Sequence, residues 1–569
     1  MTKDLLEPAF LREQIVGVDS TFETPFGERL MVYCDYTASG RCLRFVESYL
    51  QSLQRVYANT HTEDDITGRS MSQLLHEAEE AIKKSVNAGP NGRIIACGTG
   101  ATGAIDKLQQ IIGVSLSPAT RENLRKIIAA SAVDSLAFEQ ALRDRQPVVF
   151  VGPYEHHSNE ISWRQSLATT IEVQLGKSGH IDLGHLEDLL QDPAYQGRLR
   201  IGSFSAASNV TGIRTDVRKV SSLLHRYGAI ACFDYAACAP YVKIDMNPEP
   251  AGADDDPTID AIFVSPHKFL GGPGSSGILV FNDRLYRRDL PPSVAGGGTV
   301  DYVSPHDQDF IADVEEREKA GTPGILQTLR AALAFEIKRA VSVPVIEARE
   351  SGLLARAFEA WTGTPGIEIL GNQDPSRRIG IVSFNLLDPR GGYLHPKFVT
   401  AVLNDLFGIQ SRAGCSCAGP YGHRLLGIDA CTSEDYRAWV RKGYQGIKPG
   451  WCRIGFHYSM DDVEADYVVD AVRLLARYGH RLLQLYRFDP VTGAWRHRDE
   501  SERSPPFSLA AALQSGPLSS TALPGEQRAR LFAGYLAEAL RLVERLGEPT
   551  ERPEAVLDGR FGELQFFST

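Results

Sequence analysis

The chain has 569 residues, a formal net charge of −11 and 43% hydrophobic residues. That length is enough for one large domain with a sizeable core and a smaller one, and the acidic balance argues against nucleic acid as a partner. No apolar run is long enough to cross a bilayer and no signal-peptide core is seen, so we expect a cytoplasmic protein without a membrane partner. The nine cysteines are scattered and odd in number, so we expect no disulfide framework.

Short apolar segments alternate with amphipathic ones through the first half of the chain. We expect buried strands at 93–96, 148–151, 200–205, 230–233 and 261–264 and helices at 71–86 and 217–227. This alternation favours an α/β fold with a mostly parallel sheet and helices on both faces. Ligands of such sheets bind beyond the carboxyl ends of the strands.

The chain is expected to divide into four parts. These are an N-terminal segment (1–27), a large domain (28–325) with an inserted helical segment near 115–146, a smaller α+β domain (326–480) and a C-terminal extension (481–569). A helix is expected at about 526–546, but the role of the extension is not assigned by any motif.

Two of the predicted strands end in residues that suit one cofactor. Asp234 ends one strand, and Lys268 closely follows another, just before a glycine-rich loop. A lysine at the end of a buried strand can lose solvation and form a Schiff base, while a carboxylate can hold a pyridine nitrogen protonated. Lysine and aspartate together are what pyridoxal 5'-phosphate (PLP) requires.

Several motifs in order resemble the class V aminotransferase and cysteine desulfurase family, over about 35–458. They are Gly98-Thr99-Gly100-Ala101-Thr102-Gly103, Tyr154-Glu155-His156-His157, Ser208-Asn209-Val210-Thr211-Gly212, Phe233-Asp234-Tyr235-Ala236-Ala237, Ser265-Pro266-His267-Lys268 and Ala320-Gly321-Thr322-Pro323. The resemblance implies PLP fold type I, with a seven-stranded-type sheet and a smaller α+β domain.

The resemblance also implies roles for individual residues. The phosphate of PLP would contact Ala101, Thr102, Ser265 and His267, and the ring would contact His156, Asn209, Asp234 and Lys268. Thr322 would reach the phosphate of a partner subunit, which implies a homodimer with shared active sites. A turn-forming role is the alternative for Asn209, and zinc binding by His156 and His157 is rejected because no third ligand has a suitable spacing.

The segment Arg412-Ala413-Gly414-Cys415-Ser416-Cys417-Ala418-Gly419-Pro420 bears on the reaction. By resemblance Cys417 is the catalytic cysteine of desulfurases. With Cys415 it also resembles the N-terminal domain of molybdenum cofactor sulfurases, although the tail is too short for their C-terminal domain. Metal binding by both thiols, or a purely structural role for two small residues, are the alternatives.

Arg453 matches the family arginine that holds the substrate carboxylate, for which a planar guanidinium is suited. The sequence therefore predicts a PLP-dependent cysteine desulfurase that converts L-cysteine to L-alanine, leaves a persulfide on Cys417 and passes sulfur to an acceptor protein. Ala237 departs from the glutamine that many desulfurases have there. This departure keeps open an aminotransferase, epimerase or lyase acting on another amino acid, and a catalytically silent binding protein is the third hypothesis.

Overall fold

The computed structural model describes residues 6–131, 134–499, 522–548, 559 and 564–568, so parts of the predicted terminal segments lie outside the described residues. The chain forms two compact units. The first comprises Thr37–Glu347, and the second combines Leu6–Tyr36 with Ala348–Thr569. The division falls after Glu347, whereas the sequence placed it at 326, because α11 (Ile325–Val341) packs against α3 (Ile66–Ser85) of the first unit.

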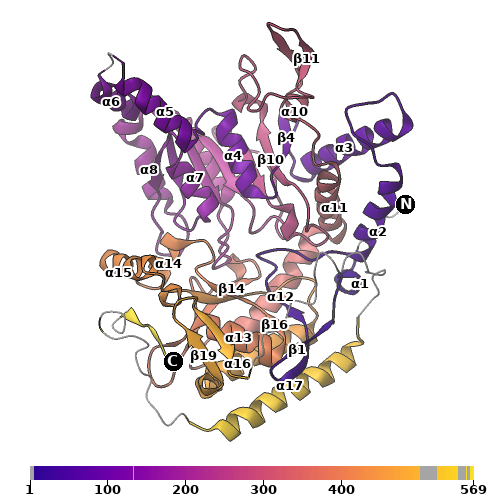
Figure 1. Ribbon diagram of the computed structural model, residues 1–569, viewed down its shortest axis with the longest axis vertical. Helices are drawn as coiled ribbons and strands as arrows, with labels where there is room; N and C mark the ends of the chain where they lie inside the picture. The colour runs from indigo at the N-terminus through magenta and orange to yellow at the C-terminus, as the bar shows by residue number, and fades with distance from the viewer. Residues whose placement is uncertain (1–5, 132–133, 500–521, 549–558, 560–563, 569) are drawn as a thin grey trace. The chain divides into compact units, whose positions relative to one another are not determined.

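The first unit is built on a seven-stranded sheet in the order β4-β10-β9-β8-β7-β5-β6 (Figure 1). The predicted strands are confirmed as β4 (Gly92–Cys97), β5 (Val148–Val151), β7 (Arg200–Ser205), β8 (Ile230–Asp234) and β9 (Ala261–Val264). The sequence missed β6 (Thr169–Glu172), a half-buried edge strand, and β10 (Gly277–Asn282). β10 runs antiparallel to both of its neighbours and the other pairings are parallel, so the expected mostly parallel α/β sheet is confirmed.

Alternate residues of each strand pack against helices on opposite faces of this sheet. Ile201 of β7 belongs to the core that α4 (Ala101–Ile111) covers. The next residue, Gly202, faces α9 (Val217–Arg226), where an added Cβ would lie 2.5 Å from a methyl group of Leu224. Helices therefore cover both faces, and the carboxyl ends of β7, β8 and β9 meet at one edge.

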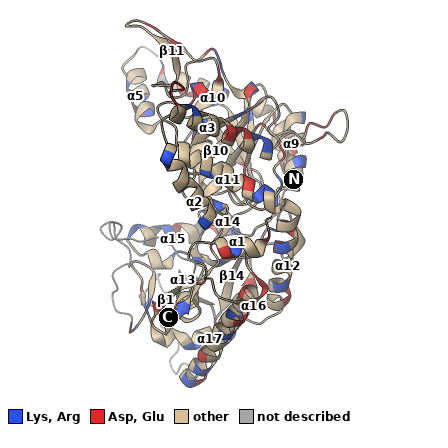
Figure 2. Ribbon diagram, turned by 90° about the vertical axis from the view of Figure 1, so that its right-hand side faces the viewer, with Lys and Arg blue, Asp and Glu red and all other residues tan. Residues whose placement is uncertain are grey.

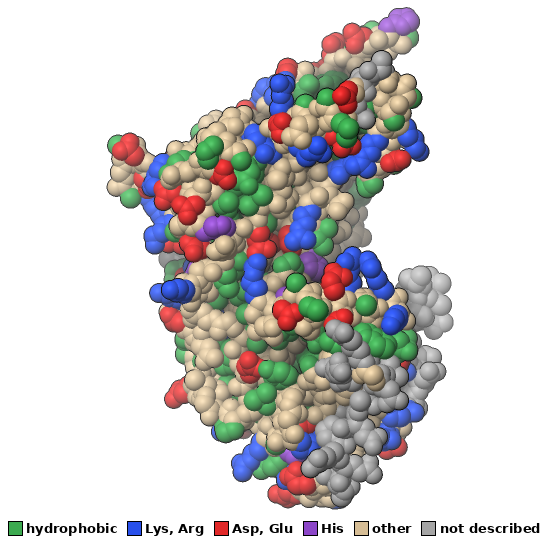
Figure 3. Space-filling view, turned by 90° about the vertical axis from the view of Figure 1, so that its left-hand side faces the viewer, with side chains coloured by type: hydrophobic (Ala, Val, Ile, Leu, Met, Phe, Trp, Pro, Cys, Tyr) green, Lys and Arg blue, Asp and Glu red, His purple; other side chains and the backbone are tan. Residues whose placement is uncertain are grey.

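The insertion predicted near 115–146 consists of α5 (Pro118–Ala129) and α6 (Ser135–Arg145). It leaves large apolar side chains exposed, among them Ile127 and Leu136. Figure 3 shows the face on which it lies, with hydrophobic and charged side chains interspersed.

The second unit has a sheet in the order β17-β18-β14-β15-β21, with β13 also paired to β14. The strands that matter for the site are β14 (Ile381–Leu387), β17 (Arg412–Gly414) and β18 (Trp451–Gly455), and all pairings among them are antiparallel. Helices α13 (Pro396–Phe407) and α16 (Asp462–Leu482) contribute to the core beside this sheet.

The helix expected in the C-terminal extension is α17 (Gly525–Leu546), which packs on α16. Tyr467 and Phe532 stack between the two helices at 4.2 Å, and Arg528 pairs with Asp461 and Asp19. Both basic and acidic residues occur along α17 (Figure 2). No described helix is both long and apolar enough to cross a membrane.

Candidate active site

Polar residues gather where the central strands of the first unit end. Asp234 is the last residue of β8 and lies opposite Ser205 of β7 and Phe263 of β9 in the strand register. Ser265 directly follows β9, and Lys268 ends the 3-10 helix η4 (Pro266–Lys268). Because these strands are parallel, their terminal residues share one edge of the sheet.

The start of α4 contacts Ser265. The backbone N–H of Ala101 donates to the Ser265 hydroxyl at 2.8 Å, and Gly100, the N-cap residue of α4, supplies no side-chain cap of its own. A Cβ added at Gly100 would lie 2.9 Å from that hydroxyl and 3.5 Å from the His267 ring, so a side chain there would crowd the site. A helix N-terminus with close polar groups is suited to an anion.

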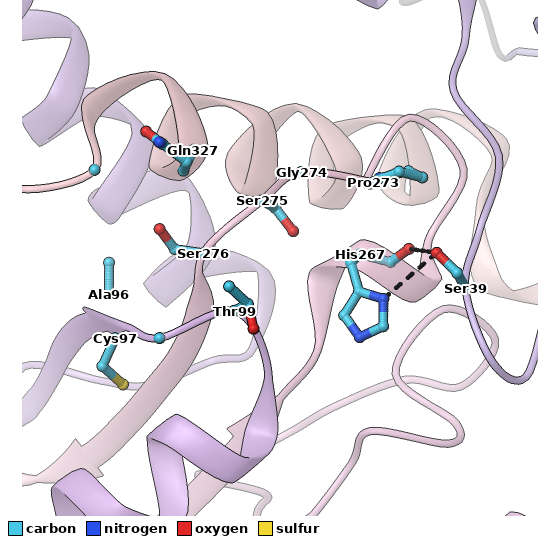
Figure 4. A pocket seen from close by; sticks show the side chains of 12 residues that line it. Ser39, Ala96, Cys97, Thr99, His267, Pro273, Gly274, Ser275, Ser276 and Gln327 are labelled. Atoms are coloured by element: carbon cyan, nitrogen blue, oxygen red, sulfur yellow. Dashed lines mark hydrogen bonds between the residues drawn. The ribbon is translucent and has the colours of Figure 1, made fainter. Parts of the chain in front are cut away.

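A pocket of about 630 Å³ adjoins this helix start (Figure 4). Its lining includes Thr99 after β4, His267 of η4 and Ser275 of the glycine-rich loop. The Ser275 hydroxyl is buried and has no hydrogen-bond partner among the described residues. Such a group gains when an acceptor or donor enters the pocket.

Asp234 and Lys268 of the first unit interact through their charges. Asp234 is 4% exposed and accepts a hydrogen bond from the Ala236 N–H at 2.8 Å. Burial raises its pKa, and the Ala236 hydrogen bond and the charge of Lys268 oppose that rise. A buried carboxylate in this state gains from a cation that approaches it. Burial and the nearby Lys268 also lower the pKa of His267 to about 4, so its ring is neutral at pH 7.

His156 lies in the turn that follows β5. Its Nδ1 accepts a hydrogen bond from the Ser158 N–H at 3.1 Å, and the hydroxyl of Ser158 lies 2.7 Å from that of Thr102. The turn thus joins the predicted ring-stacking histidine to the first turn of α4. Asn209, predicted beside the ring hydroxyl, is buried in the loop after β7.

Glu155 holds this turn in place, a role that sequence reasoning missed. Its buried carboxylate accepts hydrogen bonds from the Gly152 and Ser205 N–H groups, the Ser205 hydroxyl and the Asn159 amide. Burial raises its pKa to about 7 despite these donors, and the charge of Asp234 adds to the rise. The sequence signal that could have identified Glu155 is its position shortly after the predicted strand at 148–151.

In the second unit, strand pairing sets Arg453 beside the cysteine segment. Residues of β17 and β18 lie opposite one another, with Arg412 facing Arg453 and Gly414 facing Trp451. The Arg453 side chain is 4% exposed and donates to Asp35 at 2.9 Å, and Arg412 lies 4.0 Å from the other Asp35 oxygen. Burial lowers the pKa of Arg453, and the Asp35 carboxylate opposes that shift.

The two cysteines occupy one tight turn after β17. The Ala418 N–H donates to the Cys415 carbonyl at 3.0 Å, and the two central residues, Ser416 and Cys417, have φ of 50° and 57°. Positive φ at both central positions is the pattern of a type I′ turn, which usually contains glycine or asparagine. Cys415 is exposed and Cys417 is partly buried, and a thiolate at Cys417 would raise the pKa of Arg453.

The predicted site residues thus fall into two groups. Cys417 and Arg453 belong to the second unit, and the others belong to the first. Within the first unit, Thr322 lies in the segment before α11, where its hydroxyl accepts from the Asn59 amide at 3.0 Å. Asp35 was not predicted as a site residue, because its partner Arg453 lies 418 positions along the chain.

Comparison with known proteins agrees with this fold. Residues 128–468 match the model of the aminotransferase class-V family. This match covers more than half of the chain, so the chain belongs to that family.

Similar curated proteins carry the name probable cysteine desulfurase. One, from Halalkalibacterium halodurans, is 27% identical over 395 residues, which cover 68% of this chain and 84% of the relative. Another, from Staphylococcus aureus, is 28% identical over 399 residues, covering 69% and 84% respectively.

Solved structures share the fold. A cysteine desulfurase from Thermococcus onnurineus aligns with a TM-score of 0.61 at 20% identity and covers 79% of this chain and 95% of its own. The cysteine desulfurase CsdA from Escherichia coli aligns with a TM-score of 0.59 at 22% identity, covering 82% and 98%. The predicted fold class is thereby confirmed.

Proposed function

We propose that the protein is a PLP-dependent cysteine desulfurase that converts L-cysteine to L-alanine and leaves the sulfur on Cys417. The observation that carries the proposal is the pairing of β17 with β18. It joins the strand that leads into the cysteine turn to the strand that bears the buried Arg453. A carboxylate-binding group and a thiol thus lie within electrostatic reach of one another, as an amino-acid substrate with a reactive sulfur requires.

The residues of the first unit fit PLP. The start of α4, the absence of a side chain at Gly100 and the buried Ser275 hydroxyl suit its phosphate. The buried Asp234 carboxylate, whose pKa is raised, suits a protonated pyridine nitrogen. Lys268 would hold the aldehyde, His156 would contact the ring, and Asn209 would lie beside the ring hydroxyl.

When bound, the cofactor supplies an electron-withdrawing ring that weakens bonds at the substrate Cα. Arg453 would bind the substrate carboxylate after exchanging its present partner, Asp35. Lys268 would move the Cα proton. The Cys417 thiolate would attack the substrate sulfur, so that the carbon–sulfur bond breaks, a sulfur–sulfur bond forms and L-alanine leaves with an added proton.

Three further proposals concern the protein's setting. We propose a homodimer in which Thr322 serves the partner's phosphate site, and a sulfur-acceptor protein that takes the product sulfur. We also propose a cytoplasmic location, which is supported by the cysteines: all nine lie among the described residues and none forms a disulfide.

The experiment that tests the proposed reaction follows alanine and sulfide together. Purified protein with L-cysteine and a reductant should produce the two in equal amounts, and Cys417→Ser should lose both while keeping the absorbance of bound PLP. Cys431→Ser removes an exposed thiol elsewhere in the second unit, on α15 (Ala430–Arg441), and is the control variant. Full alanine production by Cys417→Ser would refute the proposal. Keto-acid-dependent formation of a new amino acid would instead support an aminotransferase.

A further inference from the structure

The cysteine turn holds two thiols with different exposure. Cys415 is exposed, while Cys417, two residues later, is partly buried and within electrostatic reach of Arg453. Cysteine reactivity depends on exposure and on nearby charge. The inner thiol therefore has the surroundings for reaction with an anionic substrate, and the outer thiol has access to solvent.

The turn keeps the two thiols close to one another. Its ends, Cys415 and Ala418, are joined by the hydrogen bond from the Ala418 N–H to the Cys415 carbonyl, and Cys417 lies inside the turn, only two positions after Cys415, so the two cysteine Cα atoms are at most about 7 Å apart. Two cysteines whose Cα atoms are separated by about 4.4–6.8 Å can join their sulfurs. Sulfur atoms on Cys415 and Cys417 can therefore meet by side-chain rotation.

The base of the turn is fixed. Gly414, which precedes Cys415, has φ of 117° and packs against Gly450, where an added Cβ would lie 2.8 Å from the Gly414 backbone. On the other side, α14 (Gly419–Leu425) begins directly after Ala418. The two thiols are thus held between a paired strand and a helix, and are not at the tip of a long loop.

We propose that Cys415 is a second sulfur carrier, which takes the terminal sulfur from Cys417 and presents it to the acceptor. This inference rests on the proposed function for the arrival of sulfur on Cys417. The Cys415 thiolate, having released its proton to solvent, attacks the terminal sulfur of the Cys417 persulfide. The old sulfur–sulfur bond breaks, a new one forms on Cys415, and Cys417 leaves as a thiolate ready for the next substrate. The exchange needs no external oxidant or reductant.

Turnover provides the first test. Full-length holoenzyme is given L-cysteine and quenched with a thiol-alkylating reagent, and the tryptic peptide spanning 413–424, which contains both thiols, is fragmented between them. We expect one extra sulfur atom on Cys415 in part of the molecules and on Cys417 in the rest. Two amounts are compared in the first turnovers: the sulfide that dithiothreitol releases and the alanine that is formed. In Cys415→Ser, the ratio of this sulfide to alanine should fall roughly tenfold, because a neighbouring thiol acts at high effective concentration. Cys431→Ser should leave that ratio unchanged.

Chemical loading tests the relay without turnover. Inorganic polysulfide, which donates sulfur to thiolates, is added to the protein, and the sulfur on each cysteine is followed by the same peptide analysis. Because the exchange is reversible, Cys415 should load first and pass sulfur inward. Loading of Cys417 should then be roughly tenfold slower in Cys415→Ser than in the wild type.

The two tests separate failure of the relay from failure of the desulfurase. Extra sulfur found only on Cys417, with Cys415→Ser indistinguishable from Cys431→Ser, would overturn the relay. A disulfide between Cys415 and Cys417 with release of sulfide would overturn it too, because attack would then occur at the inner sulfur. If the wild type forms no alanine from L-cysteine, the proposed function fails, and the loading rates alone decide whether the two thiols exchange sulfur.

Discussion

The two units hold their reactive groups in opposite ways. In the first unit, Asp234 is buried at a strand end and Glu155 fixes the turn after β5 through several hydrogen bonds. In the second unit, the reactive thiols lie in a turn whose two central residues have positive φ. In the proposed reaction the first arrangement would fix the cofactor, and the second would present sulfur to more than one partner.

This difference follows from what each unit must do in the proposed reaction. A cofactor stays in place, so its residues can be buried and satisfied by hydrogen bonds before it binds. A sulfur carrier must accept an atom on one side and release it on the other, which requires partial exposure. The backbone strain of the cysteine turn is tolerated because a paired strand and a helix flank it.

The largest expected effect is the removal of Lys268. Lys268→Ala should lower L-alanine formation by at least about a thousandfold, because the proposed proton-transfer group and the proposed attachment point for the cofactor would be lost together. The absorbance of lysine-bound PLP should disappear in a spectrum of the same sample. Lys243→Ala, which removes an exposed lysine of the same unit, should change neither measurement. Retained activity in Lys268→Ala would refute the assignment of this strand end as the reacting centre.

In the second unit the corresponding change is Arg453→Ala. KM for L-cysteine should rise about a hundredfold, with a smaller change in kcat, because the proposed bidentate grip of Arg453 on the substrate carboxylate would be lost. The variant should also be less stable to urea, because Asp35 loses a buried partner.

The control for this variant is Arg437→Ala, which removes an exposed ion pair with Glu434 and should affect neither quantity measurably. An unchanged KM in Arg453→Ala would leave Arg453 as a structural partner of Asp35 only.

The sequence was sufficient for features that depend on local patterns. Apolar runs ended by Asp234 or followed by Ser265 and Lys268 predicted strand ends at one edge of a sheet, and the fold confirms that edge. It was not sufficient for the pairing of Asp35 with Arg453, which depends on long-range folding. The turn at Ser416 and Cys417 was equally hidden, because neither residue type favours positive φ.

A smaller effect is expected at Glu155, as a change in how stability depends on pH. Its folded-state pKa of about 7 lies above the unfolded value of about 4.3. The folded state therefore holds the proton more tightly, so this group lowers the free energy of unfolding as pH rises from about 4.3 to 7 and adds no further change above that range.

Urea unfolding of Glu155→Gln at a series of pH values measures this contribution. The amide cannot accept all of the donors around Glu155, so stability at low pH should fall by about 1–3 kcal/mol. The free energy of unfolding should decline less steeply with rising pH in this variant than in the wild type. Asp234 also has a raised pKa and titrates in the same direction, so some decline should persist. An equally steep decline in the variant would show that Glu155 is not the titrating group.

The smallest effect is expected in the cysteine turn, at Ser416→Gly. Glycine relieves the strain of a φ of 50° but loses more conformational entropy on folding, and the two terms nearly cancel, so stability should change by less than about 1 kcal/mol.

Gly272→Ala, in the loop after Lys268, is the comparison variant, because it adds a side chain to a glycine where Ser416→Gly removes one. Its Cβ would lie 1.9 Å from the Pro266 carbonyl oxygen, and the cost should reach at least about 2 kcal/mol. Urea unfolding of both variants compares the two sites directly. A tolerated Gly272→Ala, or a strongly destabilising Ser416→Gly, would reverse the expected contrast in tolerance between the loop after Lys268 and the cysteine turn.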